Sequence, residues 1–227
     1  MPRIAVSGSQ NSGKSTLINA FLRKFPKYAN PKLSYRDLIN ELKLDINQNA
    51  SEASQDIILF SIVDNQSKYK PTDNIIFDRC SLDNLMYTFY LYQSGVVSES
   101  FVDKSVGIVR NSLSDLDIIF ITPYLPHIPL QERENRDIAL QFVEEMNQLF
   151  LSVCQAYAYD MENTQFLPTT DCPAIILLEG PTVEDRLSEM SLYLNPDGGF
   201  YNEETKSLIT NIDDVEEILR MHSKLYK

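Results

Sequence analysis

A short segment near the N-terminus has the residue types of a loop that binds phosphate. It matches the pattern G-x-x-x-x-G-K-[ST] at every fixed position. Glycines let such a backbone curl so that successive N–H groups point at phosphate oxygens, while the lysine reaches the β- and γ-phosphates and the serine hydroxyl ligates Mg²⁺. The segment therefore predicts ATP, or a close relative, and Mg²⁺ as cofactors. The candidate binding residues are Gly8, Ser9, Gln10, Asn11, Ser12, Gly13, Lys14, Ser15 and Thr16, with Lys14 also catalytic and Ser15 a metal ligand.

A second candidate is the pair Asp78–Arg79, which follows the apolar run at 75–77. If that run is a parallel strand, the pair lies at the edge where open sheets bind ligands. Asp78 can then hold Mg²⁺ or take the proton from an attacking hydroxyl, and Arg79 can contact a phosphate or the charge of the transition state. The alternative is a strand-end turn in which Asp78 has no chemistry.

Two arginines follow the apolar run at 117–121. Arg133 and Arg136 are three residues apart in a polar stretch, so they share a face if that stretch is helical. Arginines on such a segment can close over the γ-phosphate and neutralise charge in the transition state. A solvated charge run is the alternative, because acidic residues surround both arginines. Spacing alone leaves the two interpretations open.

The elements that must position these residues alternate along the chain. The sequence predicts buried strands at 3–7, 75–78, 117–121 and 174–178. It predicts helices at 14–25, 35–44, 51–65, 82–93, 98–112, 136–157 and 183–194, the last capped by Thr182. Alternating strands and helices indicate an α/β fold with a doubly wound parallel sheet. We expect one domain at 1–194 and a small hairpin-and-helix appendage at 195–227. Because the glycine-rich segment lies between a strand and a helix, a ligand-free turn is a poor alternative for it.

Composition narrows the class of protein. The chain has 227 residues, a net charge of −12 and 43% hydrophobic residues, enough for a buried core. Residues 1–43 nevertheless hold eight Lys/Arg against two acidic residues, an excess that suits phosphate handling and leaves room for a DNA partner. The alternative is that Arg23, Lys24 and Lys27 offset the dipole at the end of the first helix. No apolar run is long enough to cross a bilayer, and a strand begins too early for a signal peptide. Three widely spaced cysteines favour neither a zinc site nor disulfides, so we expect a reducing cytoplasm.

Four segments together resemble a known group. They are GSQNSGKS (8–15), YRDLI (35–39), IIFDRCSLDNLMY (75–87) and the stretch around ENRD (134–137). The chain is similar in these to P-loop kinases related to nicotinamide-riboside kinase domains and to an AAA-labelled family of small ATP-binding proteins of phages and bacteria. The resemblance runs through residue 194. Relatives include nucleoside kinases, nucleotide kinases and phage kinases that phosphorylate 5-hydroxymethyluracil within DNA.

The resemblance implies a three-layer fold, with about five parallel strands and helices on both faces. It implies ATP and Mg²⁺ at the loop, and an acceptor between Arg36, the Asp78 region and the arginine-bearing segment. It makes Arg36 and Asp37 candidate acceptor contacts, and it favours Arg136 over Arg133. It also implies phosphoryl transfer from ATP to a nucleoside, a nucleotide or a modified base in DNA.

One departure concerns the acceptor. Many nucleoside kinases have an acidic general base where this chain reads Lys-Leu-Ser-Tyr-Arg at 32–36, so Asp37 or Asp78 would have to serve. A regulatory P-loop ATPase acting on a protein or nucleic acid is the alternative, and a binding module without catalysis is a third. The acidic remainder of the chain favours a small acceptor or a narrow contact with DNA. The acidic C-terminal helix could also mediate homo-oligomerisation.

Overall fold

Four short, buried strands form the centre of the protein. The computed structural model describes residues 2–31, 42, 44–46, 50–126 and 139–200. The strands are β1 (Ile4–Ser7), β2 (Ile76–Asp78), β3 (Ile118–Ile121) and β4 (Ala174–Leu177). The helices are α1 (Lys14–Lys24), α3 (Glu52–Ser67), α4 (Ser81–Gln93), α5 (Glu99–Leu113), α6 (Leu140–Tyr159) and α7 (Val183–Met190), with 3₁₀ helices η2 (Pro71–Asp73) and η3 (Met161–Asn163). No helix in these ranges is long and apolar enough to cross a membrane.

All strand pairs are parallel, in the order β2-β1-β3-β4. Ile4 of β1 lies beside Ile76 on one side and Ile118 on the other. The sheet of the described residues therefore has four strands, and the expectation of five is wrong for this part of the chain. The four apolar runs read from the sequence supply all four strands, whereas the fifth came only from the resemblance. Since β1 is central and its neighbours connect in opposite directions, the carboxyl end of β1 is the point where such sheets bind ligands.

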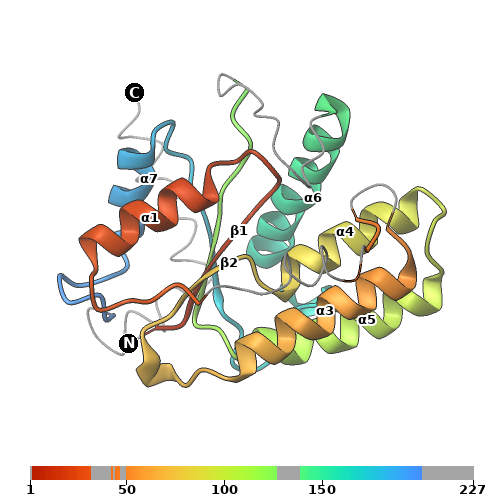
Figure 1. The fold of residues 1–227 in the computed structure, drawn as a ribbon, viewed down its shortest axis with the longest axis horizontal. Coiled ribbons are helices and arrows are strands. Elements are labelled where there is room, and N and C mark those ends of the chain that lie inside the picture. The colour runs from red at the N-terminus through yellow and green to blue at the C-terminus, as the bar shows by residue number, and fades with distance from the viewer. Residues whose placement is uncertain (1, 32–41, 43, 47–49, 127–138, 201–227) are drawn as a thin grey trace.

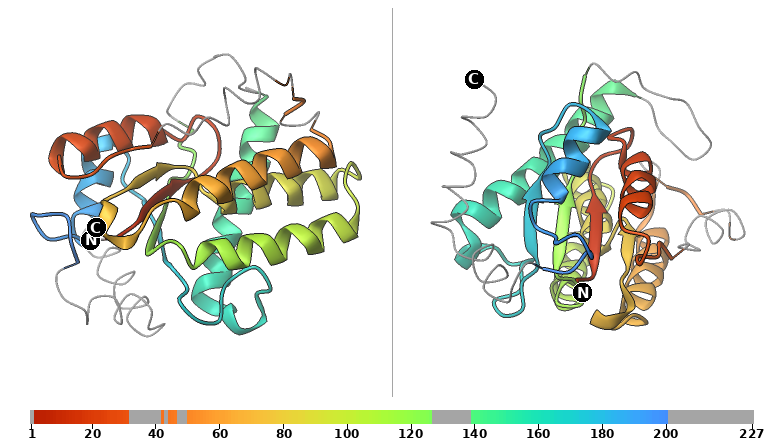
Figure 2. Two further views of the ribbon diagram at one scale, coloured as in Figure 1. Left: turned by 60° about the horizontal axis from the view of Figure 1, so that its bottom comes forward. Right: turned by 90° about the vertical axis from the view of Figure 1, so that its left-hand side faces the viewer.

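Helices cover both faces of the sheet, which gives the expected three layers. Alternate strand residues point to opposite faces, so Ile4 and Val6 pack with α1 and α7 while Ala5 faces the other side. Figure 1 shows α1 and α7 together on one side of the strands and α3, α4, α5 and α6 on the other, and Figure 2 gives two further views of this layering.

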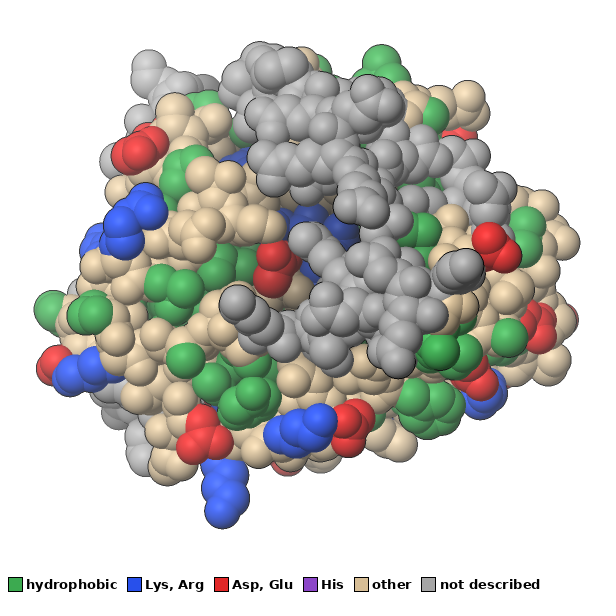
Figure 3. All heavy atoms as spheres, viewed as in Figure 1, with side chains coloured by type: hydrophobic (Ala, Val, Ile, Leu, Met, Phe, Trp, Pro, Cys, Tyr) green, Lys and Arg blue, Asp and Glu red, His purple; other side chains and the backbone are tan. Residues whose placement is uncertain are grey.

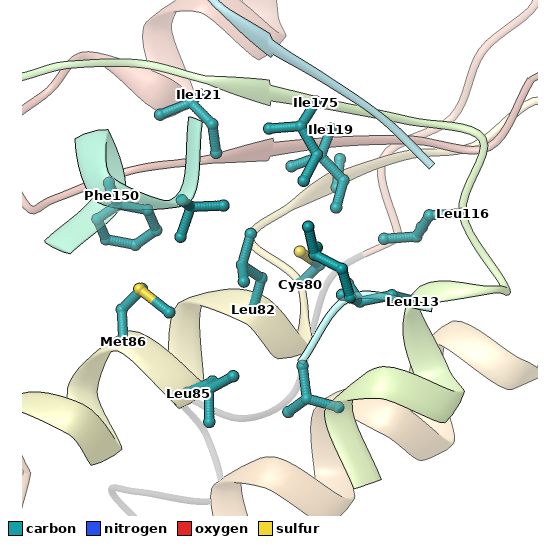
Figure 4. Close-up of a cluster of buried hydrophobic side chains, with 14 of the residues drawn as sticks. Cys80, Leu82, Leu85, Met86, Leu113, Leu116, Ile119, Ile121, Phe150 and Ile175 are labelled. Atoms are coloured by element: carbon teal, nitrogen blue, oxygen red, sulfur yellow. The ribbon is translucent and has the colours of Figure 1, made fainter. Parts of the chain in front are cut away.

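The larger apolar cluster lies between the sheet and the helices α3 to α6. In Figure 4, Ile119, Ile121 and Ile175 of the sheet point toward Leu82, Leu85 and Met86 of α4, and Phe150 of α6 closes one side. Every one of these side chains is buried. Burial of such side chains supplies roughly 1.5–3 kcal/mol each, so this cluster holds α4, and the strand ends beside it, in a fixed position.

Side-chain caps explain where three of the described helices begin. Side chains of Ser51, Ser98 and Thr182 accept backbone N–H groups at the starts of α3, α5 and α7, which confirms Thr182 as a cap. Helix α7 ends at Met190 rather than at 194, because Tyr193 and Leu194 pack into the core from turns that follow it. Helix α6 begins at Leu140, later than predicted, and the helix expected at 35–44 falls almost wholly outside the described residues.

The turn after α7 packs against the loop after α1. The Tyr28 hydroxyl lies 2.7 Å from the carbonyl oxygen of Gly198 and 3.2 Å from that of Pro2. Lys27 forms an ion pair with Asp197 at 2.8 Å. These hydrogen bonds and this ion pair join residues near both ends of the described chain. The boundary at 194/195 stays a prediction, because residues 201–227 lie outside the described part.

Candidate functional site

The segment predicted to bind phosphate forms the loop between β1 and α1. Gly8 has a φ of 143°, and a Cβ atom there would lie 2.3 Å from the carbonyl oxygen of Thr122, so only glycine fits. Gly13 has a φ of 87° in the left-handed region and forms the N-cap of α1. The loop therefore ends directly at a helix N-terminus, where N–H groups and the helix dipole favour an anion.

The Lys14 side chain lies inside the loop rather than in solvent. Its ammonium group donates to the carbonyl oxygens of Gly8 at 2.9 Å and Ser9 at 2.5 Å, and to Ser12 Oγ at 3.2 Å. Only 6% of the residue is exposed. The positive charge is thus held where a phosphate bound by the loop would lie.

Two polar atoms of the loop are buried without a hydrogen-bond partner among the described residues. They are Ser9 Oγ and Gln10 Nε2. Gln10 Oε1 accepts a hydrogen bond from the Tyr87 hydroxyl of α4 at 3.2 Å. Because buried polar groups are nearly always paired in native proteins, these two atoms fit a loop whose remaining partners belong to a ligand.

Asp78 ends β2 beside the loop. Its Oδ2 accepts a hydrogen bond of 2.8 Å from Ser15 Oγ, so the two predicted metal ligands lie together. Hydroxyl and carboxylate oxygens are ligands that Mg²⁺ accepts, and it usually retains waters and substrate phosphates as further ligands. Among the described residues no group of three or more His, Cys, Asp or Glu side chains could hold a metal ion. Ser15 Oγ and Asp78 Oδ2 are the oxygens that would hold a bound Mg²⁺ here.

Arg79 is tied to the start of the loop by a buried carboxylate. The Arg79 guanidinium lies 3.0 Å from Asp83 Oδ1 and 5.8 Å from the centre of the Tyr87 ring. Asp83 is 2% exposed and also accepts from the backbone N–H of Cys80 at 3.0 Å and of Gly8 at 3.4 Å. Cys80 occupies the N-cap position of α4, and Ser81 is the first residue of the helix.

Three residues that were not predicted from the sequence hold the phosphate loop through hydrogen bonds. One is Asp83, which accepts the Gly8 N–H. Another is Thr122, whose Oγ1 lies 2.8 Å from Ser12 Oγ and 3.1 Å from the Ser7 carbonyl oxygen. The third is Arg186 of α7, whose guanidinium donates to the carbonyl oxygen of Ser12 at 2.6 Å. The signal in the sequence was weak, since Thr122 merely follows a strand and Arg186 looks like the polar face of a helix.

The structure brings Lys14, Ser15, Asp78 and Arg79 to one edge of the sheet. Figure 3 shows acidic and basic side chains close together near the middle of the face seen in Figure 1. Four other candidates, Arg36, Asp37, Arg133 and Arg136, lie outside the described residues. The roles assigned to all of them stay predictions.

Comparison with known proteins places the chain in a family. The profile of a family described as "AAA domain" matches residues 3–165, and the chain belongs to that family. No curated protein sequence matches the chain.

Solved structures share the fold at low sequence identity. Deoxyadenosine kinase from M. mycoides, with dCMP and dCDP bound, has a TM-score of 0.60 and 17% identity over 84% of this chain and 97% of its own. NadR protein in complex with NR has a TM-score of 0.55 and 14% identity, and the match covers 95% of this chain but 50% of NadR. Thymidylate kinase from Candida albicans has a TM-score of 0.54 and 18% identity over 84% and 89% of the two chains. These likenesses establish a P-loop α/β fold.

Proposed function

We propose that the protein is an ATP-dependent phosphotransferase that acts on a nucleoside, a nucleotide or a modified base in DNA of the 5-hydroxymethyluracil type. One observation carries the proposal. The loop lysine, the Ser15–Asp78 pair and Arg79 meet at the carboxyl ends of two adjacent parallel strands. Kinases of nucleosides and nucleotides share this fold, which supports the first two acceptor classes, whereas the modified base in DNA comes only from the resemblance of the sequence.

The roles follow from the charges and their positions. Loop N–H groups and Lys14 bind the β- and γ-phosphates, and Ser15 with Asp78 holds Mg²⁺. Mg²⁺ held by these two side chains would supply positive charge that neutralises the charge developing on the phosphates. Arg79, fixed by Asp83, faces the transferred group from the α4 side.

The transfer itself needs a nucleophile and a place for its proton. An oxygen of the acceptor forms a bond to the γ-phosphorus while the bond to the β–γ bridging oxygen breaks, and ADP leaves. If the acceptor is a hydroxyl, its proton passes to a carboxylate, for which Asp78 and Asp37 are the candidates. A phosphate acceptor needs no such base.

The test is transfer of label from γ-labelled ATP to a panel of nucleosides, nucleoside monophosphates and hydroxymethylated DNA. We expect label in one class, and we expect Lys14→Ala and Asp78→Ala to abolish transfer while circular dichroism shows an intact fold. Asp64→Asn, on the exposed side of α3, is the matched control and should leave the rate unchanged.

Each outcome decides between functions. Near-wild-type turnover by Asp78→Ala would remove the role given to that residue. ATP hydrolysis that no acceptor alters but a protein stimulates would favour the regulatory ATPase instead. Transfer to DNA that weakens steeply with added salt would identify a polyanionic acceptor, because phosphate contacts make such binding salt-dependent.

A further inference from the structure

A buried arginine from the last described helix lies directly behind the phosphate loop. Arg186 is 3% exposed and lies 174 positions after Ser12, the loop residue to which it donates a hydrogen bond. Each nitrogen of its guanidinium donates to a different backbone carbonyl oxygen. Nη1 bonds Ser12 at 2.6 Å, Nε bonds Gly180 at 2.9 Å and Nη2 bonds Pro123 at 3.0 Å.

The three carbonyls belong to three separate loops. Ser12 lies in the loop after β1, Pro123 follows β3, and Gly180 precedes α7. Gly180 approaches the helix so closely that a Cβ atom there would lie 2.7 Å from Asp185 Cβ and 2.8 Å from the Arg186 backbone nitrogen. One side chain therefore joins all three loops at the carboxyl edge of the sheet.

The contact with Ser12 fixes the direction of one peptide unit. In a planar trans peptide the C=O and the following N–H point in opposite directions. The Ser12 carbonyl points back to Arg186, so the Gly13 N–H points away from Arg186. The left-handed φ of Gly13, 87°, is the conformation in which successive N–H groups converge on an anion.

The Arg186 guanidinium is buried away from water, and the acceptors of these three hydrogen bonds are uncharged carbonyl oxygens. Burial lowers the pKa of Arg186 from its ordinary value, while the nearby Glu189 carboxylate opposes that shift. An arginine remains charged in spite of such a shift. Its planar fork suits three fixed acceptors, which a lysine ammonium on a single flexible stem cannot reproduce.

We propose that Arg186 is a positioning residue for nucleotide binding, which sets the Gly13 N–H donor of the phosphate loop and couples that loop to the segments after β3 and before α7. The inference rests on the proposed function only in requiring that the loop bind nucleotide phosphate. It does not depend on which acceptor the protein uses.

The experiment measures Mg²⁺-ADP binding by calorimetry for wild type, Arg186→Lys and Arg186→Met, at a temperature where circular dichroism shows each to be folded. A lost charge-assisted hydrogen bond commonly costs on the order of tenfold or more in an equilibrium constant. We expect the Kd for ADP to rise about tenfold in Arg186→Lys and about 100-fold in Arg186→Met. In the transfer assay the KM for ATP should rise with it, while the KM for the acceptor stays unchanged.

Arg110→Lys is the matched control, because Arg110 of α5 also donates to a backbone carbonyl, that of Gln165, remote in the chain from the loop. It should bind ADP as wild type does. An ADP affinity of folded Arg186→Lys equal to that of the control would overturn the inference and leave only a structural role. Failure of wild type to bind ADP would instead overturn the proposed function.

A measurement on wild type covers the case in which neither variant folds. Nitrogen-15 NMR of arginine side chains should show a slowly exchanging Arg186 Nε–H whose resonance shifts on saturation with Mg²⁺-ADP, with the Arg110 resonance unmoved. An Arg186 resonance that exchanges rapidly, or that ADP leaves in place, would contradict the coupling.

Discussion

Arg79 has a left-handed backbone, with a φ of 80°, that non-glycine residues adopt at a cost of on the order of 1–3 kcal/mol. The cost is offset locally, because Asp83 pairs with the guanidinium and also accepts from two backbone N–H groups. Strained residues held by their surroundings concentrate at functional sites. Arg79 is therefore fixed in place before any substrate arrives.

Asp83→Asn tests that arrangement. The substitution keeps the size of the side chain but removes the negative charge opposite Arg79, so we expect a loss of stability of about 1–3 kcal/mol. The rate of phosphoryl transfer should fall as well, because the arginine is no longer held. Urea unfolding and the label-transfer assay measure the two effects.

The control for this change is Asp103→Asn on the exposed surface of α5, for which we expect neither effect. Full activity of Asp83→Asn would show that the backbone conformation of Arg79 positions its guanidinium without the ion pair to Asp83.

At the scale of elements, we expect replacement of glycine by alanine to have opposite effects on stability in the phosphate loop and in α5. Gly8→Ala would place a Cβ atom 2.3 Å from the Thr122 carbonyl oxygen, whereas Gly107 in α5 has nothing within 4 Å of an added Cβ. We expect Gly8→Ala to destabilise the protein and disrupt nucleotide binding. Gly107→Ala should stabilise it by roughly 0.5–1 kcal/mol, the difference in helix propensity.

Thermal unfolding with and without ADP measures both substitutions. ADP should raise the melting temperature of Gly107→Ala as much as that of wild type, and it should raise that of Gly8→Ala little or not at all. A normal ADP shift in Gly8→Ala would show that the loop can move away from Thr122 without losing its ligand.

The elements of the sheet could be predicted because each strand is a buried apolar run. The runs at 3–7, 75–78, 117–121 and 174–178 correspond to β1, β2, β3 and β4 within one residue at each end. The strand order could not be read from them, because pairing depends on contacts between residues that are far apart in sequence, from Ile118 with Ala174 in β3 and β4 to Ile4 with Ile118 in β1 and β3. The end of α7 was missed because Tyr193 and Leu194 continue an apolar pattern after the helix has stopped.

The candidate site was predictable where chemistry is local in sequence. Lys14, Ser15 and Asp78 followed from a motif and from the position of a strand end. Arg186 could not be predicted, because an arginine in an amphipathic helix normally faces solvent and nothing near it in sequence indicates burial. Its partners come from loops that only the folded sheet brings together.

At the scale of the whole molecule, the burial of three thiols determines how the free energy of unfolding changes at alkaline pH. Burial raises the pKa of Cys80, Cys154 and Cys172 from 9.0 to about 12 each, and the nearby Asp83 carboxylate adds to the effect for Cys80. Unfolded thiols ionise near pH 9 while the folded ones keep their protons, so this contribution to stability is complete below pH 9 and is lost as the pH rises toward 12. Each thiol changes the free energy of unfolding by at most about 1.4 kcal/mol per pH unit in that window.

Urea unfolding at pH 8 and pH 10, in the presence of a reductant, measures the loss. We expect a lower midpoint at pH 10, and native thiols that react slowly with alkylating reagents at pH 8 although all three react once the chain is unfolded. Cys172→Ser should make the pH dependence shallower. Equal midpoints at the two pH values would show that the thiols ionise in the folded protein.

Translation makes β1 first, yet its partner in β3 begins 114 residues later, at Ile118 opposite Ile4. At ~5–20 residues per second, the ribosome needs roughly 6 to 23 seconds to cover that distance. During this time the apolar strand that ends in the phosphate loop has an unpaired edge. The newly made chain therefore offers a binding site to chaperones well before it can offer one to a nucleotide.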